Sequence, residues 1–258
     1  MNQRKIYPEM NVASMWRANR RRLIQAGVIG AAGLAGMGGL QRAAFAQQGE
    51  PVQGGRLRVA STGQPAGLDN HFSGQRTVTM ITWNMYEALF TFDKEYATVP
   101  MLAEGMETSE DGLTNTITLR QGVPFHNGEE MKAQDVVASF ERWMPVSALG
   151  IALEPFFESI SAVDDYTVEL KTSQPVVALS SILARQAFGL SIHPKSVLDA
   201  AGDQPLNDAG YIGTGPFKFV ERQADRYTRL ATADRGKKLV IKSNQYSAAV
   251  WPIITALA

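Results

Sequence analysis

The sequence predicts a mixed α/β fold, and three observations predict it. Alternating apolar and polar residues mark short strands, and apolar residues at helical spacing mark helices between them. Several neighbouring strands are joined by turns short enough for hairpins. The chain has 258 residues, of which 45% are hydrophobic and 19% charged, and no internal repeat. This balance allows one large domain or two small ones, and the interleaved elements exclude a helix bundle and a sandwich.

The first segment, residues 1–46, is predicted to be an export signal. It carries seven basic residues and one acidic residue, and Leu23–Leu40 has no charged residue and six glycines. A basic start, an apolar middle and small residues at Ala44 and Ala46 match a signal that is cleaved after about Ala46. An uncleaved anchor and a buried core helix are the alternatives. Glycine is a poor helix former, and these 18 residues are at the lower limit for a membrane span.

The arginine cluster in NRRRLIQ resembles a twin-arginine export signal, with Arg20 and Arg21 as the pair. The resemblance implies export of an already folded protein across a bacterial inner membrane into the periplasm.

The first elements of the exported part are expected to be a strand, a helix and a hairpin. Residues 47–55 form a polar linker, and Arg56–Ser61 alternates apolar and basic residues like a strand. After a loop rich in Gly, Pro, Asp and Asn, apolar spacing predicts an amphipathic helix over Arg76–Phe90. The segments GMETS and NTITLR, joined by Glu110–Gly112, are expected to form the hairpin.

The later elements are expected to be three helices and two hairpins. In the first helix, Val136, Val137, Phe140 and Trp143 share one face. In chain order, we expect a helix near Met131–Trp143, a hairpin in ISAVDDYTVELKT turned at Asp164-Asp165, a helix near Val177–Leu183 followed by a short strand-like piece, a helix between Pro194 and Gly202, and a hairpin in GTGPFKFVERQADRYTRLA turned near Ala224-Asp225.

The composition excludes several classes of function. Cysteine is absent, which excludes disulfides, thiolate metal sites and a cysteine nucleophile. The chain has no GxSxG, HExxH, P-loop or GxGxxG pattern, and its paired acids are adjacent in sequence, so their side chains diverge. From Gln47 onward there are 18 basic and 24 acidic residues, a net charge of −6. We therefore expect neither an enzyme nor a nucleic-acid-binding protein.

Two local patterns allow more than one interpretation. His126, Glu129 and Glu130 are possible metal ligands, but Asn127-Gly128 between them predicts a solvated turn with positive φ, and no metal site is expected. Trp83 and Tyr86 lie three residues apart on the predicted helix after the polar loop LDNHF. Such aromatic residues suit a small-molecule or peptide site, and they equally suit the core.

Five segments in order resemble the N-terminal part of the family 5 extracellular solute-binding proteins. They are GGRLRVASTGQPAGLDNHF, WNMYEALFTFD, MLAEGMETSEDGLTNTITLRQGVPFHNGEEMKAQDVVASFERW, ISAVDDYTVELKTSQP and IGTGPFKFVER. The most specific piece is a strand, a Phe-His-x-Gly turn and a helix with an Asp-Val-x-x-Ser-x-x-Arg pattern. The likeness extends from about Gly54 to about Leu230.

The resemblance implies a non-catalytic, monomeric periplasmic receptor without a cofactor. Such receptors capture dipeptides, oligopeptides, nickel chelates or related solutes and deliver them to the permease of an ATP-binding-cassette importer. The implied fold is of the periplasmic binding protein type II, with the first lobe at residues 56–231 and an extra hairpin-containing subdomain at about 91–174. Mapped on the family, the first strand, the first helix and the return strand near GTGPF belong to the ligand-binding lobe, and the loop Gln64–His71 and the residues Thr82–Tyr86 face the cleft. The candidate ligand-binding residues are Leu68, Asp69, His71, Trp83, Tyr86 and Gly215.

The tail at residues 232–258 does not resemble the expected continuation of the family. It is more basic than the rest and ends in the apolar run AAVWPIITALA. We therefore expect a chain that carries the first lobe and lacks the second, and we take a frameshift or an early stop in the coding sequence as the hypothesis. A receptor stays the leading function. The alternatives are a truncated remnant that binds nothing and, from another class, an exported enzyme.

Overall fold

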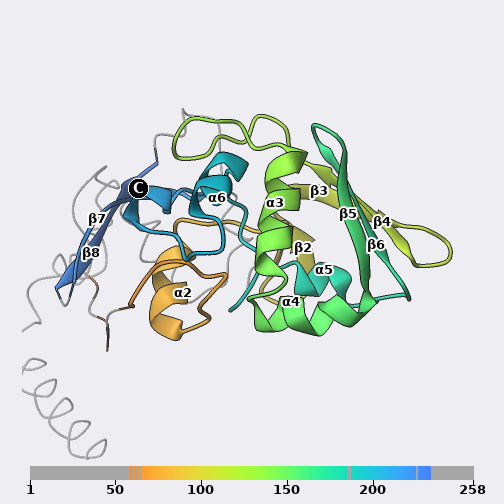
Figure 1. Ribbon diagram of the computed structural model, residues 1–258, viewed down its shortest axis with the longest axis horizontal. Helices are drawn as coiled ribbons and strands as arrows, with labels where there is room; N and C mark the ends of the chain where they lie inside the picture. Colours follow the sequence, from red (N-terminus) through yellow and green to blue (C-terminus); the bar gives the residue numbers. More distant parts are fainter. Residues whose placement is uncertain are drawn as a thin grey trace, which may run out of the picture. The chain divides into compact units, whose positions relative to one another are not determined.

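The computed structural model describes residues 59, 61, 63, 65–184, 187–224 and 226–233 (Figure 1). These residues belong to one unit of the chain, Arg56–Thr255. The predicted export signal and linker lie outside the described residues, as do most of the expected first strand and nearly all of the tail. In the described part, no single helix has the length and apolar character of a membrane span. The pair Ala133–Trp143 and Ala148–Phe156 meets that requirement only jointly, across a bend of 88°.

Helices and antiparallel hairpins alternate along the described chain, which confirms the mixed α/β prediction. The elements are α2 (Arg76–Thr82), β1 (Phe90–Phe92), β2 (Thr98–Pro100), β3 (Ala103–Thr108), β4 (Thr114–Leu119), α3 (Ala133–Trp143), α4 (Ala148–Leu153), η1 (Glu154–Phe156), β5 (Phe157–Asp164), β6 (Thr167–Thr172), α5 (Leu179–Ile182), α6 (Lys195–Ala201), η2 (Asp208–Gly210), β7 (Phe217–Gln223) and β8 (Tyr227–Thr232).

Two of the predicted hairpins join into one four-stranded antiparallel sheet in the order β3-β4-β6-β5. The join is the pairing of β4 with β6, in which Ile117 lies opposite Val168. Both side chains are fully buried, because alternate residues of these two strands face the core. The β5–β6 turn falls one residue later than predicted, at Asp165-Tyr166, since Asp164 pairs with Thr167. The third predicted hairpin, β7–β8, is confirmed as a separate two-stranded sheet.

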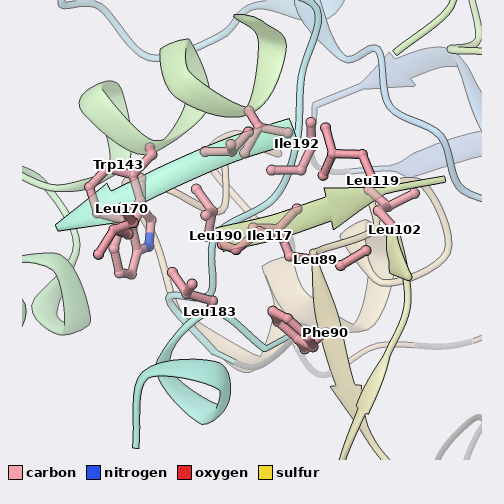
Figure 2. Packing of buried hydrophobic residues seen from close by; sticks show 14 of the residues in the cluster. Leu89, Phe90, Leu102, Ile117, Leu119, Trp143, Leu170, Leu183, Leu190 and Ile192 are labelled. Atoms are coloured by element: carbon pink, nitrogen blue, oxygen red, sulfur yellow. The ribbon is translucent and has the colours of Figure 1, made fainter. Parts of the chain in front are cut away.

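Helix α3 packs against this sheet and supplies the centre of the core (Figure 1). Phe140 and Trp143 are fully buried, as the predicted helix face requires, and Val137 is half-buried. The same hydrophobic cluster includes residues on both sides of the expected subdomain at 91–174, among them Leu89 and Leu190 (Figure 2). The subdomain therefore shares its core with the segments around it, and its boundaries stay a prediction.

The prediction of a helix over Arg76–Phe90 is wrong for its second half. Helix α2 ends at Thr82, and Trp83 caps it. Beyond it, the carbonyls of Asn84 and Met85 accept hydrogen bonds from the distant N–H groups of Phe217 (2.9 Å) and Gly215 (2.8 Å). These tertiary bonds replace the helical ones, so Trp83 and Tyr86 do not share a helix.

Three smaller differences concern short elements. The segment after Asn84 leads into β1, which pairs with β2 in a hairpin that the sequence does not predict. Helix α5 is shorter than the predicted Val177–Leu183. Of the strand-like piece expected after it, the described residues contain a bridge between Ala184 and Phe90, and residues 185 and 186 lie outside the described part.

Removing the central side chain of α3 is expected to cost much stability. Because Phe140 is fully buried, the Phe140→Ala variant should lose about 3–5 kcal/mol of unfolding free energy, through lost burial and a cavity. Urea denaturation followed by circular dichroism measures this loss. The control is Ile151→Ala on α4, where the side chain is 53% exposed and the change should stay within about 0.5 kcal/mol. Equal losses in the two variants would contradict the placement of α3 in the core.

Candidate functional site

The loop of residues 65–71, here called the pinned loop, is held by side chains from distant parts of the chain. Arg222 on β7 donates from Nη1 to the carbonyls of Pro65 (3.0 Å) and Ala66 (2.6 Å). The hydroxyl of Tyr211 accepts a hydrogen bond from the N–H of Leu68 at 3.1 Å. The loop has no helical or sheet hydrogen bonds of its own, so these contacts determine its conformation.

The strongest contact of the pinned loop is an ion pair between Asp69 and Arg142. The Nη2 of Arg142 lies 2.6 Å from the Oδ2 of Asp69, and the two side chains are only 8% and 3% exposed. The same carboxylate also accepts from the N–H groups of Leu206 (2.8 Å) and His71 (3.1 Å). Burial alone raises the pKa of Asp69, but the bonds from Arg142 and Leu206 and the nearby positive charge hold it below its usual value.

Two buried histidines complete the set here called the polar cluster, which consists of Asp69, His71, Tyr86, Arg142 and His193. The rings of His71 and His193 lie 5.2 Å apart, and the ring of Tyr86 lies 4.6 Å from that of His193. Burial lowers the pKa of His71 to about 3 and that of His193 to about 4. Both imidazoles are therefore neutral at neutral pH, and the charge of Arg142 is balanced by Asp69.

Four buried polar atoms in and beside the polar cluster have no hydrogen-bond partner within the described residues. They are the Oδ1 of Asn70, the Oη of Tyr86, the Nε of Arg142 and the Nε2 of His193. The amide nitrogen of Asn70, by contrast, donates to the Oγ of Ser191 at 2.6 Å. Buried polar atoms are normally paired, so these four have hydrogen-bonding capacity to spare.

The segment Gly213-Thr214-Gly215 crosses close to the backbone of Met85 and Tyr86. A Cβ built on Gly215 would lie 2.5 Å from the carbonyl carbon of Met85, and one on Gly213 would lie 2.5 Å from the carbonyl oxygen of Met85. Only glycine fits this approach. The segment leads into β7, as predicted, and its glycines serve the chain crossing.

The turn at His126 confirms the solvated-turn interpretation, with Gly128 at a φ of 90°. The Nε2 of His126 is bonded to the carbonyl of Gly215 at 2.8 Å, and its Nδ1 accepts from Gly213 at 3.3 Å. Glu130 accepts from the hydroxyl of Tyr166 at 2.7 Å. No group of three or more possible metal ligands occurs among the residues that the structure describes.

A surface pocket of about 170 Å³ lies beside this turn. Its walls come from the turn, from η2 with the residues after it, and from β7. The lining residues are His126, Asn127, Asp208, Ala209, Tyr211, Ile212, Lys218 and Phe219. None of them is among the residues predicted to bind a solute.

The structure brings together most of the residues predicted to contact a solute, and it buries them. The buried residues are Leu68, Asp69, His71, Tyr86 and Gly215, whereas Trp83 is half-buried. Asp69, His71 and Tyr86 belong to the polar cluster, and Leu68 lies in the same loop. That these side chains contact a solute stays a prediction. The contacts observed in the structure stabilise the conformation of the pinned loop.

Three residues of this site are not among those predicted from the sequence. Arg142 is the last residue of the Asp-Val-x-x-Ser-x-x-Arg pattern, which is the one available signal for it. Ser191 carries no signal, because its partners His71 and Asn70 lie 120 and 121 positions away in the chain. His193 carries none either, because its ring contacts the rings of His71 and Tyr86, which are also distant in the sequence. Spacing along a sequence does not report such contacts.

A family model described as "Bacterial extracellular solute-binding proteins, family 5 Middle" matches residues 97–242. Among curated relatives, the chain is 31% identical over 177 residues to the glutathione-binding protein GsiB of Pectobacterium atrosepticum, with 66% of this chain and 33% of that protein covered. It is 32% identical over 207 residues to the dipeptide-binding protein of Escherichia coli, with 71% and 38% covered. The chain thus spans about a third of the length of the curated relatives it matches.

Solved periplasmic receptors share the fold. The oligopeptide-binding protein AppA from Bacillus subtilis, in complex with a nonapeptide, aligns with a TM-score of 0.60 and 29% identity, covering 72% of this chain and 38% of that one. The periplasmic binding protein DppA from Helicobacter pylori, in complex with the peptide STSA, aligns with a TM-score of 0.57 and 27% identity, covering 66% and 37%.

Adding one methyl group at Gly215 is expected to destabilise the chain crossing. The Gly215→Ala variant places its Cβ against the backbone of Met85, which cannot move aside, so we expect a loss of about 1–3 kcal/mol or more. Urea denaturation measures it. Gly105→Ala on β3 is the matched control, because a Cβ there meets nothing within 4 Å. A Gly215→Ala variant as stable as this control would show that the close approach is absent.

The buried histidines are expected to make stability fall with acidification. Their native pKa values of about 3 and about 4 lie below the unfolded value of about 6.5, so the unfolded chain binds more protons below that pH. The stabilisation is complete above about pH 6.5 and is lost as the pH falls toward 4, by up to about 1.4 kcal/mol per pH unit for each histidine. Urea denaturation at about pH 7 and about pH 5 measures the slope. The His71→Asn variant lacks one of the two groups and should show about half the wild-type slope, whereas a flat wild-type profile would refute the neutral pair.

Proposed function

Because the chain belongs to the family 5 bacterial extracellular solute-binding proteins, we propose that it acts in the substrate-binding component of an ATP-binding-cassette importer. Its part is to capture a peptide or a similar small solute for delivery to the permease in the inner membrane. The observation that carries this proposal is the alignment of the described fold with a receptor solved in complex with a nonapeptide. The names of the curated relatives, which include glutathione-binding and dipeptide-binding proteins, agree with a small peptide-like ligand.

The pinned loop and the end of α2 are the proposed solute-binding surface of this lobe. Gly67 and Trp83 are only partly covered, so their atoms can be reached from solvent. Leu68, Asp69 and His71 lie beneath them and hold the loop in place. An indole presents a flat apolar face, which suits the side chains of a peptide. The Nε1 of Trp83 is buried, so this apolar face is what the residue would offer to a solute.

The proposed mechanism is a shift between open and closed forms. In the intact receptor, a second lobe would face this one across a cleft. A solute that contacts both lobes does so only in the closed form, so binding stabilises that form. No step of this mechanism breaks or forms a covalent bond, and a binding protein without catalysis agrees with the family.

The proposed place of action is the periplasm. The solved relative DppA from Helicobacter pylori is named as a periplasmic binding protein, which fits this location. The twin-arginine pair Arg20 and Arg21 and cleavage after about Ala46 are the proposed means of reaching it, and both lie outside the described residues. The proposed partners are the permease subunits, with the receptor itself a monomer that carries no cofactor.

Binding of defined peptides is expected to raise the melting temperature. The probes are glutathione, a dipeptide and a nonapeptide. A probe at a hundred times its Kd that binds only the native state adds about 2.7 kcal/mol of stability. Thermal-shift screening followed by calorimetry measures this, and at least one probe should bind.

The control compares two aromatic positions. Trp83→Ala should weaken binding, whereas Tyr96→Ala should not, because Tyr96 is 86% exposed at the turn between β1 and β2. No shift with any of the three probes would count against the receptor and in favour of a remnant that binds nothing.

A further inference from the structure

Arg142 contacts the pinned loop at two alternate residues. Its Nη2 donates to the Oδ2 of Asp69 at 2.6 Å, and its Nη1 donates to the Oδ1 at 3.4 Å. The same Nη1 lies 3.2 Å from the Nδ1 of His71. The guanidinium also lies 4.9 Å from the ring centroid of Phe72, within the range of a cation–π contact. One side chain therefore touches three of four consecutive residues.

The chemistry of these contacts determines where the proton of His71 sits. A guanidinium has only donors, so the Nδ1 of His71 must accept and carries no hydrogen. The single proton of the neutral ring is then on Nε2. That atom lies 2.8 Å from the carbonyl oxygen of Ser191, which can only accept. The two ends of the ring independently require the same tautomer.

Helix α3 makes Arg142 a rigid source of these contacts. Arg142 lies in the last turn of α3, between Phe140 and Trp143, both of which are fully buried in the core. Its Nη2 donates a further hydrogen bond to the carbonyl of Gln204 at 3.0 Å. The backbone of Arg142 is therefore held by α3 and the core, and its guanidinium has one hydrogen bond outside the pinned loop.

From this geometry we propose that Arg142 is a positioning residue: its guanidinium donates to the Nδ1 of His71, together with the Ser191 carbonyl holds the ring in the Nε2–H tautomer, and thereby fixes the pinned loop in its solute-binding conformation. The tautomer directs the ring toward Ser191, and the carboxylate of Asp69 anchors the backbone two residues earlier. The tautomer part stands on the geometry alone. The solute part rests on the proposed function.

A simpler ion pair would need only a positive charge at this place. A lysine would supply that charge, but it is a point donor and cannot reach both oxygens of Asp69 and the Nδ1 of His71 in one plane. The Arg142→Lys variant therefore separates positioning from charge balance. Arg229→Lys on β8 is the matched control, because Arg229 pairs with Glu221 at an exposed site.

The first measurement is ¹⁵N NMR of the imidazoles in the full chain. In the wild-type protein at neutral pH, His71 should be in the Nε2–H form, and this needs no variant. In Arg142→Lys, the ring should stay in the Nε2–H form, because the Ser191 carbonyl still accepts from Nε2, but the Nδ1 resonance should shift as it loses the hydrogen bond from the guanidinium. Arg229→Lys should keep the wild-type spectrum. A wild-type His71 with its proton on Nδ1, or an unchanged Nδ1 resonance in Arg142→Lys, would overturn the proposal. If Arg142→Lys does not fold, the wild-type spectrum still decides the tautomer.

The second measurement is hydrogen exchange at the amides bound to Asp69. The N–H groups of His71 and Leu206 should exchange roughly tenfold faster or more in Arg142→Lys, while that of Ile117 in β4 keeps its protection. Equal acceleration at Ile117 would indicate general destabilisation and would contradict a local positioning role.

The third measurement is the affinity for whichever peptide probe binds the wild-type protein. Arg142→Lys should weaken it roughly tenfold, in line with a displaced binding loop. Wild-type affinity in a variant whose Nδ1 resonance has shifted would overturn the solute part alone. If no probe binds the wild-type protein, the proposed function fails, and the NMR and exchange measurements still decide the tautomer part.

Discussion

The buried ion pair between Asp69 and Arg142 is the constraint on which the pinned loop and its surroundings depend. Removing two charges from water is costly, and their attraction repays it only when the geometry is good and the other polar atoms are also bonded. Here the carboxylate accepts from the Leu206 amide as well, and the guanidinium donates to Gln204 and His71. The requirement to satisfy both charges thus brings the pinned loop, α3 and the segment before η2 to one point.

Much of the fold follows from signals that act over a few residues. The hairpins β3–β4, β5–β6 and β7–β8 were predictable because alternation and turn residues lie within a dozen positions of each other. Helix α6 is bounded by Pro194 and by Gly202, which has a φ of 55°. The pairing of β4 with β6 was not predictable, since α3 and α4 separate the two strands in the chain. It depends on which buried faces fit together.

The candidate site was predictable only in its first part. The polar loop and its aromatic neighbour are visible in the sequence, but the partners that fix their geometry are far away. Arg142, His193 and Tyr211 reach the loop only in the folded chain. The error at Tyr86 has the same origin: local spacing favours a helix there, and hydrogen bonds to the Gly-Thr-Gly crossing override it.

The distances along the chain between the pinned loop and its partners also affect the order of folding. Pro65 is bonded to a residue 157 positions later, and Leu68 and Asp69 to residues 143 and 137 positions later. The hairpins and α3 can form from neighbouring residues while the chain is still being synthesised. The pinned loop cannot reach its native conformation until the chain as far as Arg222 has left the ribosome. The proposed solute-binding surface is therefore among the last parts of the described chain to reach its native structure, and a nascent chain arrested before that residue would carry a formed core without it.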